Sequence, residues 1–134
     1  MPPLKHNIYI VDDDPDDCEA IREAFLQHQQ QPEFTLMHDG ESLMKTLRST
    51  DHYPSVILLD LNMPGKDGRT ALQEIKADNN LRHIPVIVLT TSGSPREKQA
   101  AYKIGANCFI TKPDTFNQFV QLTGSISRLW LNAS

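Results

Sequence analysis

The stretch SVILLD, residues 55–60, is apolar up to its last position, where a carboxylate stands. A short apolar run of this kind predicts a strand buried on both faces, and such strands are typical of parallel sheets. Turn-forming residues 62–65 follow, and after them Leu72 and Ile75 recur at helical spacing. We therefore expect a buried strand that ends at Asp60 and continues through a loop into a helix.

The same order of strand, polar turn and helix recurs along the rest of the chain. We expect further strands at residues 8–11, 34–38, 85–90 and 107–111. Four more helices are expected. One carries Cys18, Ile21 and Phe25, a second carries Leu43, Met44 and Leu47, and the other two span residues 96–104 and 115–131. Five strands alternating with five helices predict an α/β fold, because parallel strands need crossover connections that cover both faces of the sheet.

Two helices carry features with more than one interpretation. Asp14 before Pro15 is typical of a helix N-cap, and a further metal-site carboxylate is the alternative. The core-facing stripe expected in the last helix is Phe116, Phe119, Val120, Thr123 and Ile126. Leu122, Leu129 and Trp130 flank this stripe, either as a partner or dimer face or as part of a tightly packed terminal helix.

Composition narrows the class of protein. With 13 basic and 17 acidic residues the net charge is -4, and no Lys/Arg block favours direct nucleic-acid binding. Cys18 and Cys108 lie outside any CxxC spacing, so we expect free thiols in a reducing cytosol, and five scattered histidines indicate surface positions. No apolar run has the length of a signal peptide or a membrane span, so we expect a soluble, cytoplasmic protein.

Polar residues stand where the predicted strands end. They are Asp12, Asp13 and Asp14 after the first strand, Asp60 after the third, Thr90 and Thr91 after the fourth, and Lys112 after the fifth. In sheets of this kind, ligands bind beyond the carboxyl ends of the strands. Clustered carboxylates repel one another and need a hard cation and a nearby ammonium, so we expect Mg²⁺.

This residue set suits phosphoryl transfer. The Asp60 carboxylate can act as a nucleophile toward phosphorus once neighbouring charges neutralise the transferring oxygens. Asp12 and Asp13 would hold the metal, while Thr90 and Lys112 would contact phosphoryl oxygens. We therefore predict an acyl phosphate at Asp60.

The chain resembles the receiver domains of response regulators in two-component signalling. The resemblance rests on residues 11–13, 58–64, 65–68, 89–90 and 111–113, which read VDD, LLDLNMP, GKDG, LT and TKP. It covers nearly the whole chain and implies a flavodoxin-like sheet of order 2-1-3-4-5. It also implies that residues 1–134 form a single receiver domain, with a core of about 7–131 and no output domain.

By the same resemblance, Asp60 accepts a phosphoryl group from a sensor histidine kinase. Mg²⁺ would be bound by Asp13, Asp60 and the backbone carbonyl of Asn62, with Asp12 acting through water. Thr90 and Phe109 would form the switch that repacks the face of the fourth helix, fifth strand and fifth helix. The family also implies a cis peptide at Lys112-Pro113. Phe109 stands where tyrosine is frequent, which puts any role of that hydroxyl in doubt.

The resemblance implies a regulator that transfers and loses its own phosphoryl group rather than an enzyme with external substrates. The expected partner is a downstream target protein, or a histidine phosphotransfer protein in a relay, and a homodimer through the switch face is possible. Residues 78–85 and 90–92 resemble stand-alone regulators of phytochrome-type or other hybrid sensor kinases. Ser92 either tunes phosphoryl lifetime, as its position in the family implies, or simply belongs to a capped loop.

Two other classes of function fit the sequence less well. A haloacid-dehalogenase-type phosphatase shares the aspartyl nucleophile but needs a second acid two residues on, where this chain has Asn62. A degenerate receiver would bind partners without phosphorylation, and the complete set of acidic, hydroxyl and lysine positions disfavours it.

Overall fold

Five parallel strands form one sheet in the order β2-β1-β3-β4-β5, as predicted. The computed structural model describes residues 5–63, 67–91 and 93–131. The strands are β1 (Asn7–Val11), β2 (Glu33–Met37), β3 (Val56–Leu59), β4 (Val86–Thr90) and β5 (Cys108–Thr111). The helices are α1 (Pro15–Phe25), α2 (Gly40–Ser49), α3 (Gly68–Ala77), α4 (Pro95–Ile104) and α5 (Phe116–Ile126), followed by a π-helical turn, η1 (Ser127–Leu131).

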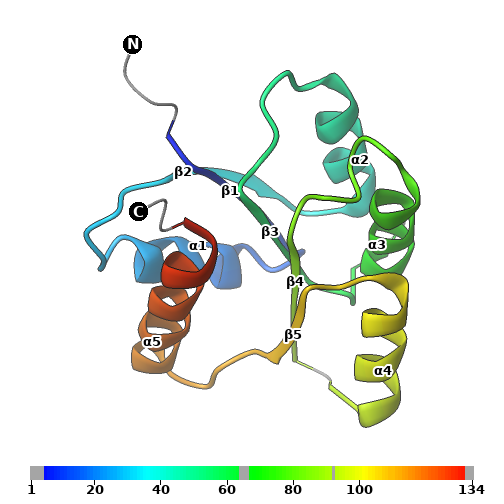
Figure 1. Cartoon of the computed structure of the whole chain (residues 1–134). Coiled ribbons are helices and arrows are strands. Elements are labelled where there is room, and N and C mark those ends of the chain that lie inside the picture. The colour runs from blue at the N-terminus through cyan, green and yellow to red at the C-terminus, as the bar shows by residue number, and fades with distance from the viewer. Residues whose placement is uncertain (1–4, 64–66, 92, 132–134) are drawn as a thin grey trace.

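Helices cover both faces of the sheet, with α1 and α5 on one side and α2, α3 and α4 on the other (Figure 1). Alternate residues of each strand enter the two resulting cores. In β1, Ile8 and Ile10 pack with α1 and α5, whereas Tyr9 and Val11 pack with α2 and α3. This two-residue period explains why the buried strands are apolar throughout their length.

Side-chain caps fix where the helices begin. The cap residues are Asp14, Asp39, Asp67, Ser94 and Thr115. At α1 the Asp14 carboxylate accepts a hydrogen bond from the Asp16 N–H at 2.9 Å, and Pro15 takes the first helical position. The predicted N-cap is therefore confirmed, and each cap satisfies an N–H group that the helix leaves unpaired.

The last helix differs from the prediction at both ends. Phe116 is 45% exposed, so its expected place on the buried stripe is wrong; burial begins one turn later, at Phe119. The α-helix also stops at Ile126, and the wider π-helical turn changes which side chains face the core. Leu131 is buried as a result, while Leu129 is 71% exposed.

One further expectation is corrected and another is confirmed. The Lys112-Pro113 peptide is trans, since the described residues contain no cis bond, and trans is the form that X-Pro bonds favour by about 0.5–1 kcal/mol. Cys18 and Cys108 are free, as predicted. In the part of the chain that the structure describes, no helix is both long enough and apolar enough to cross a membrane.

Candidate functional site

The strand ends bring four of the predicted residues to one edge of the sheet. Backbone hydrogen bonds continue past the strands themselves: the Asp60 N–H donates to the Val11 carbonyl at 2.9 Å, and the Lys112 N–H donates to the Thr90 carbonyl at 2.8 Å. Because the strands are parallel, these bonds align their carboxyl ends and hold the side chains that follow on the same edge. Asp12, Asp60, Thr90 and Lys112 therefore lie on the same edge of the sheet, as the prediction requires.

Three carboxylates gather there in a geometry that suits a cation. Asp12, Asp13 and Asp60 each offer one oxygen, and these oxygens lie within 4.8 Å of one another. Asp12 and Asp60 are buried, whereas Asp13 is exposed and leaves the group open to solvent. Hard oxygen donors in such a partly open group fit a divalent cation such as Mg²⁺ or Mn²⁺, which keeps some of its water ligands.

Lys112 supplies the counter-charge. Its ammonium, on a side chain only 6% exposed, lies 2.7 Å from Asp12 Oδ2, 2.7 Å from Asp17 Oδ2 and 3.5 Å from Asp60 Oδ2. Burial alone would lower the pKa of this amine, but the hydrogen bonds with Asp12 and Asp17 and the charges of Asp12 and Asp60 outweigh burial and raise the pKa. The ammonium is therefore charged at neutral pH, as phosphoryl contact requires.

Burial disfavours the ionised form of the Asp12 carboxyl. Burial raises the pKa of this carboxyl to about 6, with a further contribution from the charge of Asp60. The hydrogen bonds from Lys112 and from the Asp14 N–H lower the pKa, but they offset only part of the effect of burial. A divalent cation would favour the ionised form, so cation binding and ionisation of Asp12 are coupled.

Sequence reasoning missed Asp17. This residue belongs to the first turn of α1 rather than to a strand end, yet its carboxylate lies as close to the Lys112 ammonium as that of Asp12 does. The only available signal was the run of acidic residues after Asp14, which also suits a helix start and therefore identifies no partner.

The loop after β3 fixes the orientation of the Asp60 carboxylate. The Asn62 N–H donates to Asp60 Oδ1 at 3.1 Å, and the Asn62 side-chain amide donates to Thr90 Oγ1 at 3.2 Å. The first residue of α3, Gly68, packs so closely behind this loop that a Cβ atom there would lie 2.2 Å from the Asp60 carbonyl oxygen. Glycine is therefore required for the loop and α3 to approach each other.

The two predicted switch residues are both buried. Thr90 is fully buried at the end of β4, with its hydroxyl bonded to Asn62, and Phe109 is 7% exposed in the core beneath α4. The Phe109 N–H on β5 donates to the hydroxyl of Tyr102, an exposed residue of α4, at 3.1 Å. The Phe109 side chain is therefore packed into the core. Thr91 is exposed, and Ser92 lies outside the described residues.

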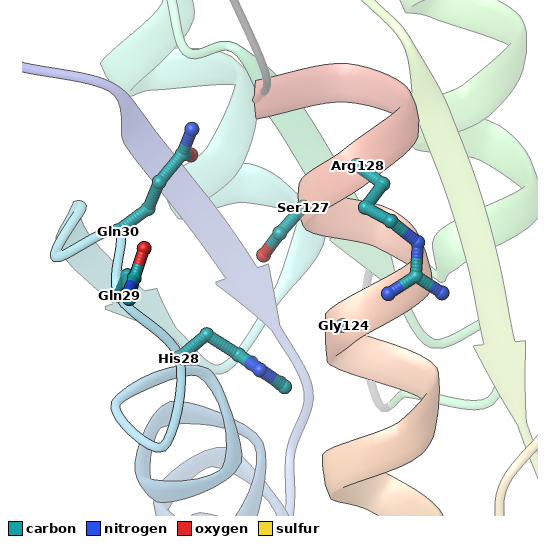
Figure 2. Close-up of a pocket in the computed structure, with 6 residues that line it drawn as sticks. All are labelled: His28, Gln29, Gln30, Gly124, Ser127 and Arg128. Atoms are coloured by element: carbon teal, nitrogen blue, oxygen red, sulfur yellow. The ribbon is translucent and has the colours of Figure 1, made fainter.

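A hollow lies apart from these residues, between the segment after α1 and the end of α5 (Figure 2). It has a volume of about 390 Å³ and is lined by His28, Gln29, Gln30, Gly124, Ser127 and Arg128. The His28 Nε2–H donates to the Val120 carbonyl at 2.9 Å, so this histidine joins the segment after α1 to α5 and is half-buried rather than fully exposed. Among the described residues, no carboxylate side chain lines the hollow, and we assign it no part in phosphoryl transfer.

Known proteins share both the sequence and the fold. The response regulator receiver domain family matches residues 8–123. Rcp1, a response regulator of Synechocystis sp., is 35% identical across 92% of this chain and 88% of its own. The crystal structure of the phosphorylated cyanobacterial phytochrome response regulator RcpA has a TM-score of 0.90 at 36% identity, covering 98% of this chain and 97% of that one. The crystal structure of Mn²⁺-bound Rcp1 has a TM-score of 0.86 at 33% identity, covering 98% of this chain and 97% of that one. The chain thus belongs to the response regulator receiver domain family of two-component signalling.

Proposed function

We propose that this protein is phosphorylated on Asp60 by a sensor histidine kinase. The observation that carries the proposal is the position of the Asp60 carboxylate, which lies both in the three-carboxylate group and 3.5 Å from the Lys112 ammonium. A nucleophilic carboxylate flanked by a cation site and by a fixed ammonium has the neighbours that phosphoryl transfer requires.

The proposed reaction is a transfer from a phosphohistidine of the kinase. A bond forms between an Asp60 oxygen and phosphorus as the bond between phosphorus and the histidine nitrogen breaks; that nitrogen keeps the electron pair and takes a proton from water. Lys112 pairs with one phosphoryl oxygen and the Thr90 hydroxyl donates to another. Both residues act from buried positions, where such contacts are stronger than they are in water.

We propose Mg²⁺ as the resident cation. Asp12, Asp13 and Asp60 would hold it together with the backbone carbonyl of Asn62, and the Mn²⁺-bound structure of the relative Rcp1 supports a divalent ion. When bound, the cation would neutralise negative charge on the transferring phosphoryl group.

The output is proposed to be a change of surface rather than turnover of an external substrate. Ala101 is the one buried residue of α4, whereas each of the other α-helices buries four. A helix with so few core contacts is easily displaced. Movement of Thr90 toward the phosphoryl group would therefore reach α4 through Phe109, whose N–H is bonded to Tyr102.

The partners follow from this surface and from the relatives. A downstream target protein, a phosphotransfer protein in a relay, or a second copy of the chain would recognise the face of α4, β5 and α5. Because RcpA is a phytochrome response regulator, we propose a phytochrome-type sensor kinase as the phosphodonor.

Intact-mass spectrometry with acetyl phosphate and Mg²⁺ tests the proposal. The wild type should gain the mass of one phosphoryl group, and Asp60→Asn should gain none. Asp51→Asn is a matched control, because Asp51 is exposed in the loop before β3, and it should be phosphorylated like the wild type. An unmodified wild type, or an equal gain in Asp60→Asn, contradicts the proposal.

A further inference from the structure

We propose that Asp17 is a positioning residue for Lys112, holding its ammonium in the orientation that phosphoryl transfer at Asp60 requires. The inference rests on the proposed function and assigns a new role within the same site. It starts from the 2.7 Å contact between Asp17 Oδ2 and Lys112 Nζ, which joins the first turn of α1 to the end of β5.

The start of the helix does not by itself account for this contact. Acidic residues in a first turn stabilise a helix through its dipole, and Asp16 meets that condition as well as Asp17 does. Asp16 is exposed, however, whereas the Asp17 side chain is 30% exposed and bonded to an ammonium that is almost fully buried. Asp17 therefore has an ammonium partner, and among the described residues Lys112 makes no such contact with Asp16.

The three donors of the ammonium explain what the contact does. A lysine side chain is a flexible stem, so the direction of its N–H groups is set by the acceptors around it. Two acceptors, on Asp12 and Asp17, lie at 2.7 Å, the length of a strong charge-assisted bond. The third N–H is thereby directed toward Asp60, whose oxygen lies farther away at 3.5 Å. A phosphoryl oxygen on Asp60 would give that donor a closer acceptor.

Asp12 cannot hold the ammonium in place alone, because it also belongs to the three-carboxylate group that we assign to the cation. Asp17 lies outside that group and has no such second role. With the Asp12 carboxylate shared with a cation, Asp17 would be the acceptor that keeps the Lys112 ammonium in place. This division of roles predicts that Asp17 affects phosphorylation through Lys112 and not through cation affinity.

The first test compares Asp17→Ala with Asp16→Ala in the full chain. Both changes remove one acidic residue from the same helical turn, but only Asp17→Ala removes a Lys112 acceptor. We expect Asp17→Ala to lower the rate constant of phosphorylation by saturating acetyl phosphate about tenfold, and Asp16→Ala to leave it within about twofold. Asp17→Asn keeps an acceptor oxygen and should restore most of the rate. Mg²⁺ affinity, measured by titration calorimetry, should be the same in both alanine variants.

The second test is a double-mutant cycle with Lys112→Ala. If Asp17 acts through the ammonium, Asp17→Ala should have no further effect in the Lys112→Ala background. NMR of the lysine ammonium groups adds a readout that does not depend on activity. The Lys112 signal, identified by its loss in Lys112→Ala, should exchange slowly with water in the wild type and Asp16→Ala and rapidly in Asp17→Ala.

The results of these tests separate the positioning role of Asp17 from the phosphorylation of Asp60. Equal rates for Asp17→Ala and Asp16→Ala, multiplicative effects in the cycle, or unchanged ammonium exchange would overturn the positioning role while leaving phosphorylation at Asp60 standing. A wild type that gains no phosphoryl group would overturn the proposed function, and the role of Asp17 with it.

Discussion

Replacing Gly68 with alanine should damage both the stability of the fold and the geometry of the site. The added Cβ would lie 2.2 Å from the Asp60 carbonyl oxygen and 2.6 Å from the Leu61 Cα. Both contacts are with backbone, so no side chain can rotate away. To restore an ordinary contact of 3.4 Å, the Asp60 carbonyl would have to move by about 1.2 Å relative to α3.

Two magnitudes follow. Overpacking of this kind costs about 1–3 kcal/mol of unfolding free energy, which exceeds the gain of about 0.5–1 kcal/mol for alanine in an unobstructed helix. Misplacement by about 1 Å can slow a positioned reaction on the order of 100-fold. We therefore expect Gly68→Ala to unfold at lower urea concentration and to be phosphorylated at least tenfold more slowly by acetyl phosphate.

Gly124→Ala is the matched control for these measurements. Its Cβ would lie 3.0 Å from His28 Cε1, a side-chain atom of the segment that follows α1 (Figure 2). A side chain can yield by a few tenths of an ångström, so this variant should lose less stability and should be phosphorylated at the wild-type rate. The reasoning about the Asp60 loop is refuted if Gly68→Ala matches the wild type in both unfolding and phosphorylation.

Two further predictions follow from the buried acidic end of the sheet. The pKa of Asp12 is raised to about 6 in the folded state, so the folded protein binds more protons than the unfolded chain between about pH 4 and 6. The contribution of Asp12 to the unfolding free energy therefore falls as the pH rises through that window. Thermal melts of the metal-free protein should show this loss relative to Asp12→Asn, and an identical pH profile for the two proteins would contradict it. Cys18 is buried, and burial and the charge of Asp12 raise the pKa of its thiol to about 12. A thiol reagent should therefore modify half-buried Cys108 first. Modification of Cys18 in the native state would contradict its buried position.

The sequence was sufficient to predict the site residues whose positions are set by the ends of the strands. Asp12, Asp60, Thr90 and Lys112 all follow or end apolar runs, and a parallel sheet brings such positions to one edge whatever the details of the loops. The resemblance to receiver domains added Phe109 and the backbone carbonyl of Asn62. Phe109 is buried as an inward-packed aromatic would be, whereas its switching role and the carbonyl's role as a ligand stay predictions.

What the sequence could not predict depends on contacts between elements. Asp17 lies on α1, and only the packing of that helix beside the end of β5 brings it to Lys112. His28 has a surface-like sequence context, yet it is half-buried because Gly124 lets α5 approach it closely. The π-helical turn could not be predicted either, because residues 127–131 carry no glycine or proline that would mark a change of helix type.

The central claim is that the Asp60 carboxylate becomes an acyl phosphate, and borohydride trapping tests it most directly. Borohydride reduces an acyl phosphate at its carbonyl carbon and releases phosphate, so the aspartate that was modified is converted to homoserine. After treatment with acetyl phosphate and Mg²⁺, reduction and proteolysis, tandem mass spectrometry should find homoserine at position 60 and aspartate at positions 12, 13 and 17. Homoserine at one of those three positions with intact Asp60, or at none of the four, would contradict the account.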